Sequence, residues 1–174
     1  NPHSYCKHNK KHKHTEIMVW HQLNWKGDSL KTLYTGGTFD IFHYGHTNLL
    51  KKCSMIADEV IVALNTDEFI NEFKGRFPVM SYRERELALL NCPYVDKVIP
   101  NFSGADSKPT IMSINPSIIA IGDDWAHKDY YSQMQFTQEW LDENEIVLLY
   151  IPYTKSISTS EIIKRVKERS WLIS

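Results

Sequence analysis

The chain has 174 residues, 42% of them hydrophobic and 24% charged, with a formal net charge of −1. This length and composition suit one globular domain with a substantial core and exclude a disordered or fibrous chain, and the near-neutral charge gives no reason to expect nucleic acid as a partner. No apolar run approaches a membrane span, and the three widely spaced cysteines do not resemble a disulfide framework, so we expect a cytoplasmic protein without membrane insertion.

The first 29 residues are expected to form an N-terminal arm and cover segment, and residues 30–174 the folded domain. Four of the eight histidines lie in residues 1–15, together with four lysines and few apolar side chains. A segment of this composition cannot bury itself into order. A flexible basic tail is therefore favoured over a metal site, which would have to use Cys6, His8, His12 and His14 without a second cysteine pair.

From residue 30 onward, strand and helix patterns alternate. The expected strands cover residues 30–34, 59–64, 97–99, 117–121 and 146–151. The expected helices cover residues 47–57, 82–90, 108–114, 133–143 and 159–169, and Ser81 with Glu84 forms a capping box before the second of them. This alternation predicts an α/β, Rossmann-like, doubly wound fold, with a mostly parallel five-stranded sheet and helices on both faces. Ligands bind such sheets beyond the carboxyl ends of the strands.

The segment between the first strand and the first helix, residues 35–46, reads Thr-Gly-Gly-Thr-Phe-Asp-Ile-Phe-His-Tyr-Gly-His. Gly36 and Gly37 let the backbone approach a ligand closely. A helix that starts near His46 presents free N–H groups and the positive end of its dipole. His43 and His46, at positions i and i+3, can share one face of the first turn. Two imidazoles beside a helix N-terminus fit a phosphate better than they fit zinc.

Two later motifs also follow strands: Gly-Asp-Asp-Trp at residues 122–125 and Ile-Ser-Thr-Ser at residues 157–160. Gly-Thr-Phe-Asp followed by His-x-Gly-His resembles the signature of the nucleotidyltransferase superfamily related to class I aminoacyl-tRNA synthetases. Tyr-Val-Asp-Lys-Val-Ile-Pro at residues 94–100 and the two later motifs fall in the order and spacing of the cytidylyltransferase branch. The Gly-Asp-Asp-Trp form looks most like glycerol-3-phosphate cytidylyltransferase. The resemblance covers about residues 30–169.

This resemblance implies transfer of CMP from CTP to a phosphorylated alcohol, foremost sn-glycerol 3-phosphate, with release of pyrophosphate. It implies Mg²⁺ that arrives with CTP rather than in a metal site of the protein, and a homodimer, for which residues 82–96 are the expected contact. The expected catalytic residues are His43, His46, Lys74 in a loop after the second strand, and Arg85. The expected nucleotide-binding residues are Gly37, Thr38, Phe39, Gly45, Ile157, Ser158, Thr159 and Ser160. The expected acceptor-binding residues are Asp40, Lys108, Asp123, Asp124 and Trp125.

The chain departs from the family pattern at two positions. Pro93 and Tyr153 stand where the family usually has arginines, and Lys155 restores a positive charge two residues after the second. Three alternatives stay open, the last of them because of these departures. The acceptor is phosphocholine or phosphoethanolamine, for which Tyr130, Tyr131 and Trp140 offer an aromatic cage. The chain is an adenylyltransferase that uses ATP. Or it is a catalytically weak nucleotide-binding module.

Overall fold

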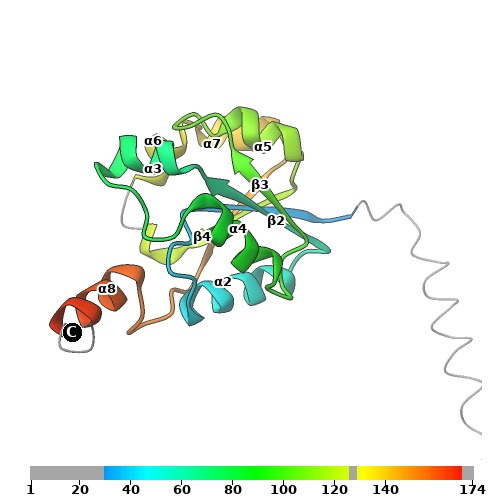
Figure 1. The fold of residues 1–174 in the computed structure, drawn as a ribbon. Helices are drawn as coiled ribbons and strands as arrows, with labels where there is room; N and C mark the ends of the chain where they lie inside the picture. The colour runs from blue at the N-terminus through cyan, green and yellow to red at the C-terminus, as the bar shows by residue number, and fades with distance from the viewer. Residues whose placement is uncertain (1–29, 126–128, 170–174) are drawn as a thin grey trace, which may run out of the picture.

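The computed structural model describes residues 30–125 and 129–169, and its centre is a five-stranded sheet in the order β3-β2-β1-β4-β5 (Figure 1). All four neighbouring pairs are parallel. The strands are β1 (Thr32–Gly37), β2 (Glu59–Asn65), β3 (Lys97–Asn101), β4 (Ile118–Gly122) and β5 (Val147–Ile151). The predicted fold class is confirmed. The expected N-terminal arm lies outside the described residues.

Helices cover both faces of this sheet (Figure 1). The helices are α2 (Tyr44–Ser54), α3 (Asp67–Lys74), α4 (Tyr82–Leu90), α5 (Lys108–Ile114), α6 (Tyr130–Met134), α7 (Gln138–Glu143) and α8 (Thr159–Glu168), with the 3₁₀ turn η1 (Asp123–Trp125) after β4. Leu50 of α2 and Leu89 of α4 pack with Val60 and Val62 on one face. Ile111 of α5 and Leu141 of α7 pack with the alternate strand residues on the other face. No helix in the described part of the chain is long and apolar enough to span a bilayer.

The direction in which successive strands are added to the sheet changes between β1 and β4, which lie side by side in the sheet. From β1 it adds β2 and β3 on one side, and then β4 and β5 on the other. This is the topological switch point at which open α/β sheets bind ligands. The register pairs Gly37 with Leu64 and Asn65 with Asn101, so the carboxyl ends of β1, β2 and β3 meet at one edge.

The predicted bounds of α4 and α5 are confirmed, and the capping box of α4 forms from both sides: Ser81 accepts from the Glu84 N–H and Glu84 accepts from the Ser81 N–H. Other bounds were misplaced. β1 runs to Gly37 rather than to residue 34, because Gly36 and Gly37 still pair with Ala63 and Leu64 of β2. β3 continues through Pro100, which is tolerated because β3 is an edge strand.

Two helical regions differ from the prediction. α3 was not predicted, and Lys74 is its last residue rather than part of a loop. Thr66 caps the start of this helix, and Gly75, with a φ of 67°, caps its end. The single helix expected over residues 133–143 is two, α6 and α7. Gln135 adopts a φ of 56° and Thr137 caps the next helix, so the backbone reverses between them.

Candidate active site

The loop between β1 and α2 holds a strained backbone. Phe39 and Ile41 have φ angles of 49° and 47°, a region that a β-branched residue rarely enters. The buried carboxylate of Asp40 stabilises this conformation, since its oxygens accept the N–H groups of Ile41 at 3.0 Å, Val79 at 2.9 Å and Met80 at 2.9 Å. We predicted that Asp40 binds the acceptor. In the structure its carboxylate ties the β1–α2 loop to the segment before α4, and its role toward the acceptor stays a prediction.

The two histidines form the N-terminal cap of α2. His43 Nδ1 accepts the Gly45 N–H at 3.1 Å, and His46 Nδ1 faces the His43 N–H at 3.4 Å. The imidazole rings stack with centroids 3.8 Å apart and an interplanar angle of 20°. Gly45 is required for this arrangement, because a Cβ there would lie 3.0 Å from His43 Cε1 and 3.3 Å from Ile157. The predicted phosphate-facing pair is thus brought together as one unit.

This capping assigns the tautomer of both rings. A nitrogen that accepts a backbone N–H carries no proton, so the proton of each neutral imidazole sits on Nε2. His46 also packs against Phe39 and Phe42, with centroids 5.1 Å and 5.6 Å away. Burial, with a smaller effect from neighbouring His43, lowers the pKa of His46 to about 3, and burial also lowers the pKa of His43. At neutral pH the pair therefore offers two neutral Nε2–H donors at a helix N-terminus.

The low histidine pKa values predict a loss of stability in mild acid. In the unfolded chain a histidine has a pKa of about 6.5, whereas folded His46 stays neutral. The unfolded state therefore binds more protons as the pH falls. We expect the free energy of unfolding to decrease from pH 6.5 downward, by up to about 1.4 kcal/mol per pH unit from His46, with His43 acting in the same direction. Urea unfolding at pH 7.5, 6.0 and 5.0 measures this, and His46→Phe should flatten the slope. Equal stability at the three pH values would contradict the assignment.

A cavity of about 300 Å³ lies at the carboxyl ends of β1 and β2, within the range of small-ligand sites. It is lined by the β1–α2 loop, by α3, by α6 and by the start of α8. Among the predicted site residues it brings together Gly37, Thr38, Phe39, Asp40, His46, Lys74, Thr159 and Ser160. Its remaining walls include the aromatic side chains Phe69, Phe73, Phe77 and Tyr130 together with polar ones such as Asn65 and Asn101.

Lys74 is the cation of this cavity that the sequence predicted. Its Nζ donates to Thr38 Oγ1 at 3.2 Å, which holds the ammonium over the end of β1. Burial and the nearby Arg76 lower the pKa of Lys74, and the attraction of Asp40 only partly offsets them. Both effects penalise an ammonium that has no anion beside it, so an incoming phosphate would be stabilised there.

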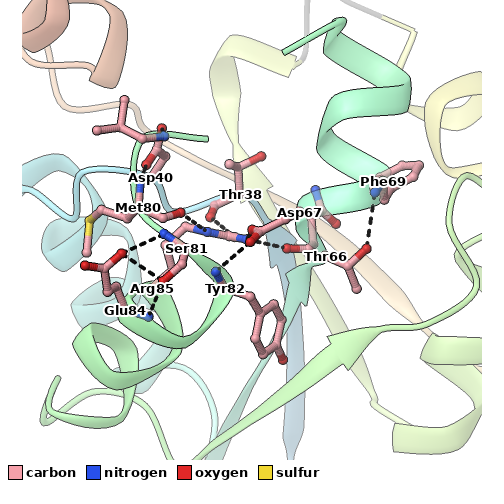
Figure 2. Close-up of polar contacts among 12 residues, drawn as sticks. Thr38, Asp40, Thr66, Asp67, Phe69, Met80, Ser81, Tyr82, Glu84 and Arg85 are labelled. Carbon is pink, nitrogen blue, oxygen red and sulfur yellow. Dashed lines mark hydrogen bonds and ion pairs between the residues drawn. The ribbon is translucent and has the colours of Figure 1, made fainter. Parts of the chain in front are cut away.

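Arg85, which we predicted to grip a phosphate, is fully buried among polar partners from the β1–α2 loop, the start of α3 and the segment before α4 (Figure 2). Its guanidinium donates to the carbonyls of Met80 at 3.1 Å, Thr38 at 2.7 Å and Asn65 at 2.9 Å, and it forms an ion pair with Asp67. Asp67 in turn accepts the Tyr82 N–H at 3.0 Å. Arg85 does not line the cavity. Its contacts join the β1–α2 loop, the end of β2, the start of α3 and the segment before α4.

The start of α8 completes the site. Ser158 caps the helix by accepting the Glu161 N–H at 3.1 Å, and Thr159 Oγ1 donates to the Asp40 carbonyl at 2.8 Å. A second cavity of about 60 Å³ lies on the other side of His46, which lines both, and His43, Gly45 and Tyr153 line only the smaller one. The Tyr153 hydroxyl donates to the Ile157 carbonyl at 3.1 Å, so this side chain steadies the segment before α8.

Three other predicted acceptor residues, Lys108, Asp123 and Asp124, do not line the larger cavity. Lys108 is the first residue of α5 and lies 4.0 Å from Asp106. Asp123 Oδ1 accepts the Tyr153 N–H at 2.7 Å and so holds the loop after β5. Asp124 Oδ1 lies over Gly122, where an added Cβ would approach it to 2.7 Å. The side chain of Trp125 lies outside the described part of the chain.

The residues present do not form a metal cage. Among residues 30–125 and 129–169, no three His, Cys, Asp or Glu side chains are grouped to hold an ion. The Asp40 carboxylate, which lines the larger cavity, already accepts three backbone N–H groups.

Sequence reasoning missed two asparagines at the strand ends. Asn65 ends β2, Asn101 ends β3, and both line the larger cavity. The predicted strands stop short of both residues, so neither was recognised as a strand-end residue. The signal that could have found them is position alone: a polar side chain that follows a buried apolar strand of a parallel sheet points to the ligand-binding edge.

The model of the cytidylyltransferase-like family matches residues 34–165. Glycerol-3-phosphate cytidylyltransferase of Bacillus subtilis is 36% identical over 79% of this chain and 98% of that protein. Ethanolamine-phosphate cytidylyltransferase of Dictyostelium discoideum is 32% identical over 78% of this chain but 38% of that protein. FAD synthase of Pyrococcus abyssi is 34% identical over 76% of this chain and 90% of that protein. Among solved structures, the lipopolysaccharide core biosynthesis protein of Thermoplasma volcanium superposes with a TM-score of 0.59, at 23% identity, over 74% of this chain and 100% of that one.

Proposed function

The chain belongs to the cytidylyltransferase-like family of nucleotidyltransferases, and we propose that it transfers CMP from CTP to a phosphorylated alcohol, with sn-glycerol 3-phosphate as the acceptor. The observation that supports this most strongly is the stacked pair His43 and His46, whose Nδ1 atoms cap α2 and whose Nε2–H groups remain as donors. Two donors of fixed tautomer at a helix N-terminus suit a phosphate that gains negative charge.

In the proposed reaction an oxygen of the acceptor phosphate attacks the α-phosphorus of CTP. A bond forms between that oxygen and the phosphorus, and the bond to the oxygen that bridges to the β-phosphorus breaks. Pyrophosphate leaves with the electron pair, so the protein need not form a covalent intermediate. Its tasks are to align the two phosphates and to stabilise the charge that develops on them.

The residues that line the larger cavity fit these tasks. His46 would donate to the reacting phosphate, and Lys74 would neutralise charge beside Thr38. The first turn of α8, at Thr159 and Ser160, offers backbone N–H groups to the same triphosphate. Since His46 lies between the two cavities, we propose that the acceptor enters the larger one and that the nucleoside extends past Gly45 toward Tyr153. We further propose that Mg²⁺ accompanies CTP, and that the enzyme acts as a cytoplasmic homodimer.

A panel of substrates tests the proposal. CTP or ATP is mixed with glycerol 3-phosphate, phosphocholine, phosphoethanolamine or flavin mononucleotide, and pyrophosphate release is followed. We expect release with CTP and glycerol 3-phosphate, at a kcat/KM at least tenfold above the other pairs. Phosphoethanolamine and flavin mononucleotide are included because relatives named for them show similar identity. Preference for another pair would refute the acceptor or the nucleotide, and no release with any pair would refute the enzymatic function.

A further inference from the structure

A chain of hydrogen bonds, one buried and the others half-buried, runs along the wall of the larger cavity, from the loop after β3 to the end of β2. Ser103 Oγ lies 2.8 Å from Thr110 Oγ1, and Thr110 Oγ1 donates to Asn101 Oδ1 at 3.1 Å. Asn101 Nδ2 donates to Asn65 Oδ1 at 2.9 Å and to the Gly104 carbonyl at 3.3 Å. Thr110 and Asn101 are both buried.

This chain determines which way the amide of Asn65 points. The Gly104 carbonyl can only accept, so the Asn101 atom that faces it must be the nitrogen. The same nitrogen faces Asn65, so the Asn65 atom that meets it must be the oxygen. The Asn65 nitrogen is then left with two N–H groups that have no acceptor among the described residues. An amide orientation that is otherwise ambiguous is here set by a backbone carbonyl.

The backbone of Asn65 is also fixed by its neighbours. Its own carbonyl accepts from Arg85 at 2.9 Å, and its backbone pairs with Asn101 across the sheet. It lines the cavity on the α3 side, with Lys74 and Phe69. A side chain fixed at both its backbone and its amide oxygen, with two donors left over at a cavity wall, is a preorganised hydrogen-bond donor.

We propose that Asn65 determines acceptor specificity by donating a hydrogen bond to an oxygen of the acceptor alcohol, outside its phosphate group. This inference rests on the proposed function and narrows its substrate class to phosphorylated polyols. A hydroxyl oxygen can accept from the amide, whereas a quaternary or primary ammonium cannot. The carboxylate of Asp40, which lines the same cavity, accepts three backbone N–H groups and attracts the Lys74 ammonium, so its charge is already partly compensated within the protein.

The test is a thermodynamic cycle that removes the Asn65 amide and the hydroxyl groups of the acceptor separately. Binding of glycerol 3-phosphate and of propyl phosphate, which lacks both hydroxyls, is measured by calorimetry on wild type and on Asn65→Ala. Loss of the hydroxyls should weaken binding to wild type by about 3- to 10-fold, and it should leave binding to Asn65→Ala unchanged, because the donor is already gone. The affinity for CTP should be the same in both proteins. Asn91→Ala, at an exposed asparagine after α4, is the matched control and should behave as wild type.

A second variant probes the positioning chain. Thr110→Val removes the donor to Asn101 and should weaken binding of glycerol 3-phosphate while sparing propyl phosphate and CTP. Equal discrimination between the two phosphates in wild type and Asn65→Ala would overturn the inference, as would failure of wild type to bind either phosphate. Because binding is measured without turnover, a wild type that binds glycerol 3-phosphate but releases no pyrophosphate would refute only the proposed function.

Discussion

Replacing His46 with alanine is expected to reduce kcat for pyrophosphate release by about 10²–10³-fold, which is the usual effect of removing one preorganised donor from a transition-state charge. The structure gives the reason: Nδ1 faces a backbone N–H, so Nε2–H is the part of the ring left for a ligand, and the low pKa keeps the ring neutral and singly protonated. Release of labelled pyrophosphate under saturating CTP measures the effect, and circular dichroism confirms that the variant is folded.

His43 allows the structural and the catalytic roles of the pair to be separated. Its Nδ1 caps α2 by accepting the Gly45 N–H, and asparagine is also a good N-cap residue. His43→Asn should therefore keep the free energy of unfolding, measured with urea, within about 0.5 kcal/mol of wild type. It should lose activity as His46→Ala does, because asparagine has no donor at the Nε2 position. If His43→Asn remains fully active, the imidazole serves only as a cap and its proposed role is wrong.

Much of the fold was predictable because its signals are local. The capping box of Ser81 and Glu84 and the alternation of apolar strands with helices require no knowledge of distant contacts. The missed helix α3 also carried a local signal, a Thr66 cap followed by Asp67 and Glu68 in the first turn. The glycine and proline residues just after it drew the prediction toward a loop.

The location of the candidate site was predictable only for residues that belong to a sequence motif. His43, His46 and Lys74 were placed in or beside a cavity as expected. Arg85 and Asp40 were assigned to substrates, and the sequence did not show that both also bind backbone groups far away in sequence, such as Thr38 and Val79. Whether a charged side chain faces a ligand or a loop depends on long-range packing, and the pattern of residue types does not contain that information.

The strongest effect on stability is expected at Arg85. Replacing it with methionine should lower the free energy of unfolding by about 3–5 kcal/mol, because Asp67 and three backbone carbonyls would lose the charge that pairs with them in a buried setting. Urea unfolding at pH 7.5 measures this. The matched control is Arg83→Met on the same helix: that side chain is 69% exposed and pairs only with Glu86, so it should change stability by less than about 1 kcal/mol.

A second substitution distinguishes the charge from the geometry. Arg85→Lys keeps the positive charge but cannot reach Met80, Thr38, Asn65 and Asp67 at once, since an ammonium has three donors and lacks the planar fork. It should recover part of the stability that Arg85→Met loses, while kcat remains reduced, because the β1–α2 loop at Thr38 and the end of β2 at Asn65 would no longer be held together. Full recovery of kcat by lysine would mean that the charge alone suffices, and an Arg85→Met variant as stable as Arg83→Met would show that the network contributes nothing to folding. In the arrangement described, the buried cation supports both the strained β1–α2 loop and the cavity wall, so its loss should lower stability and turnover together.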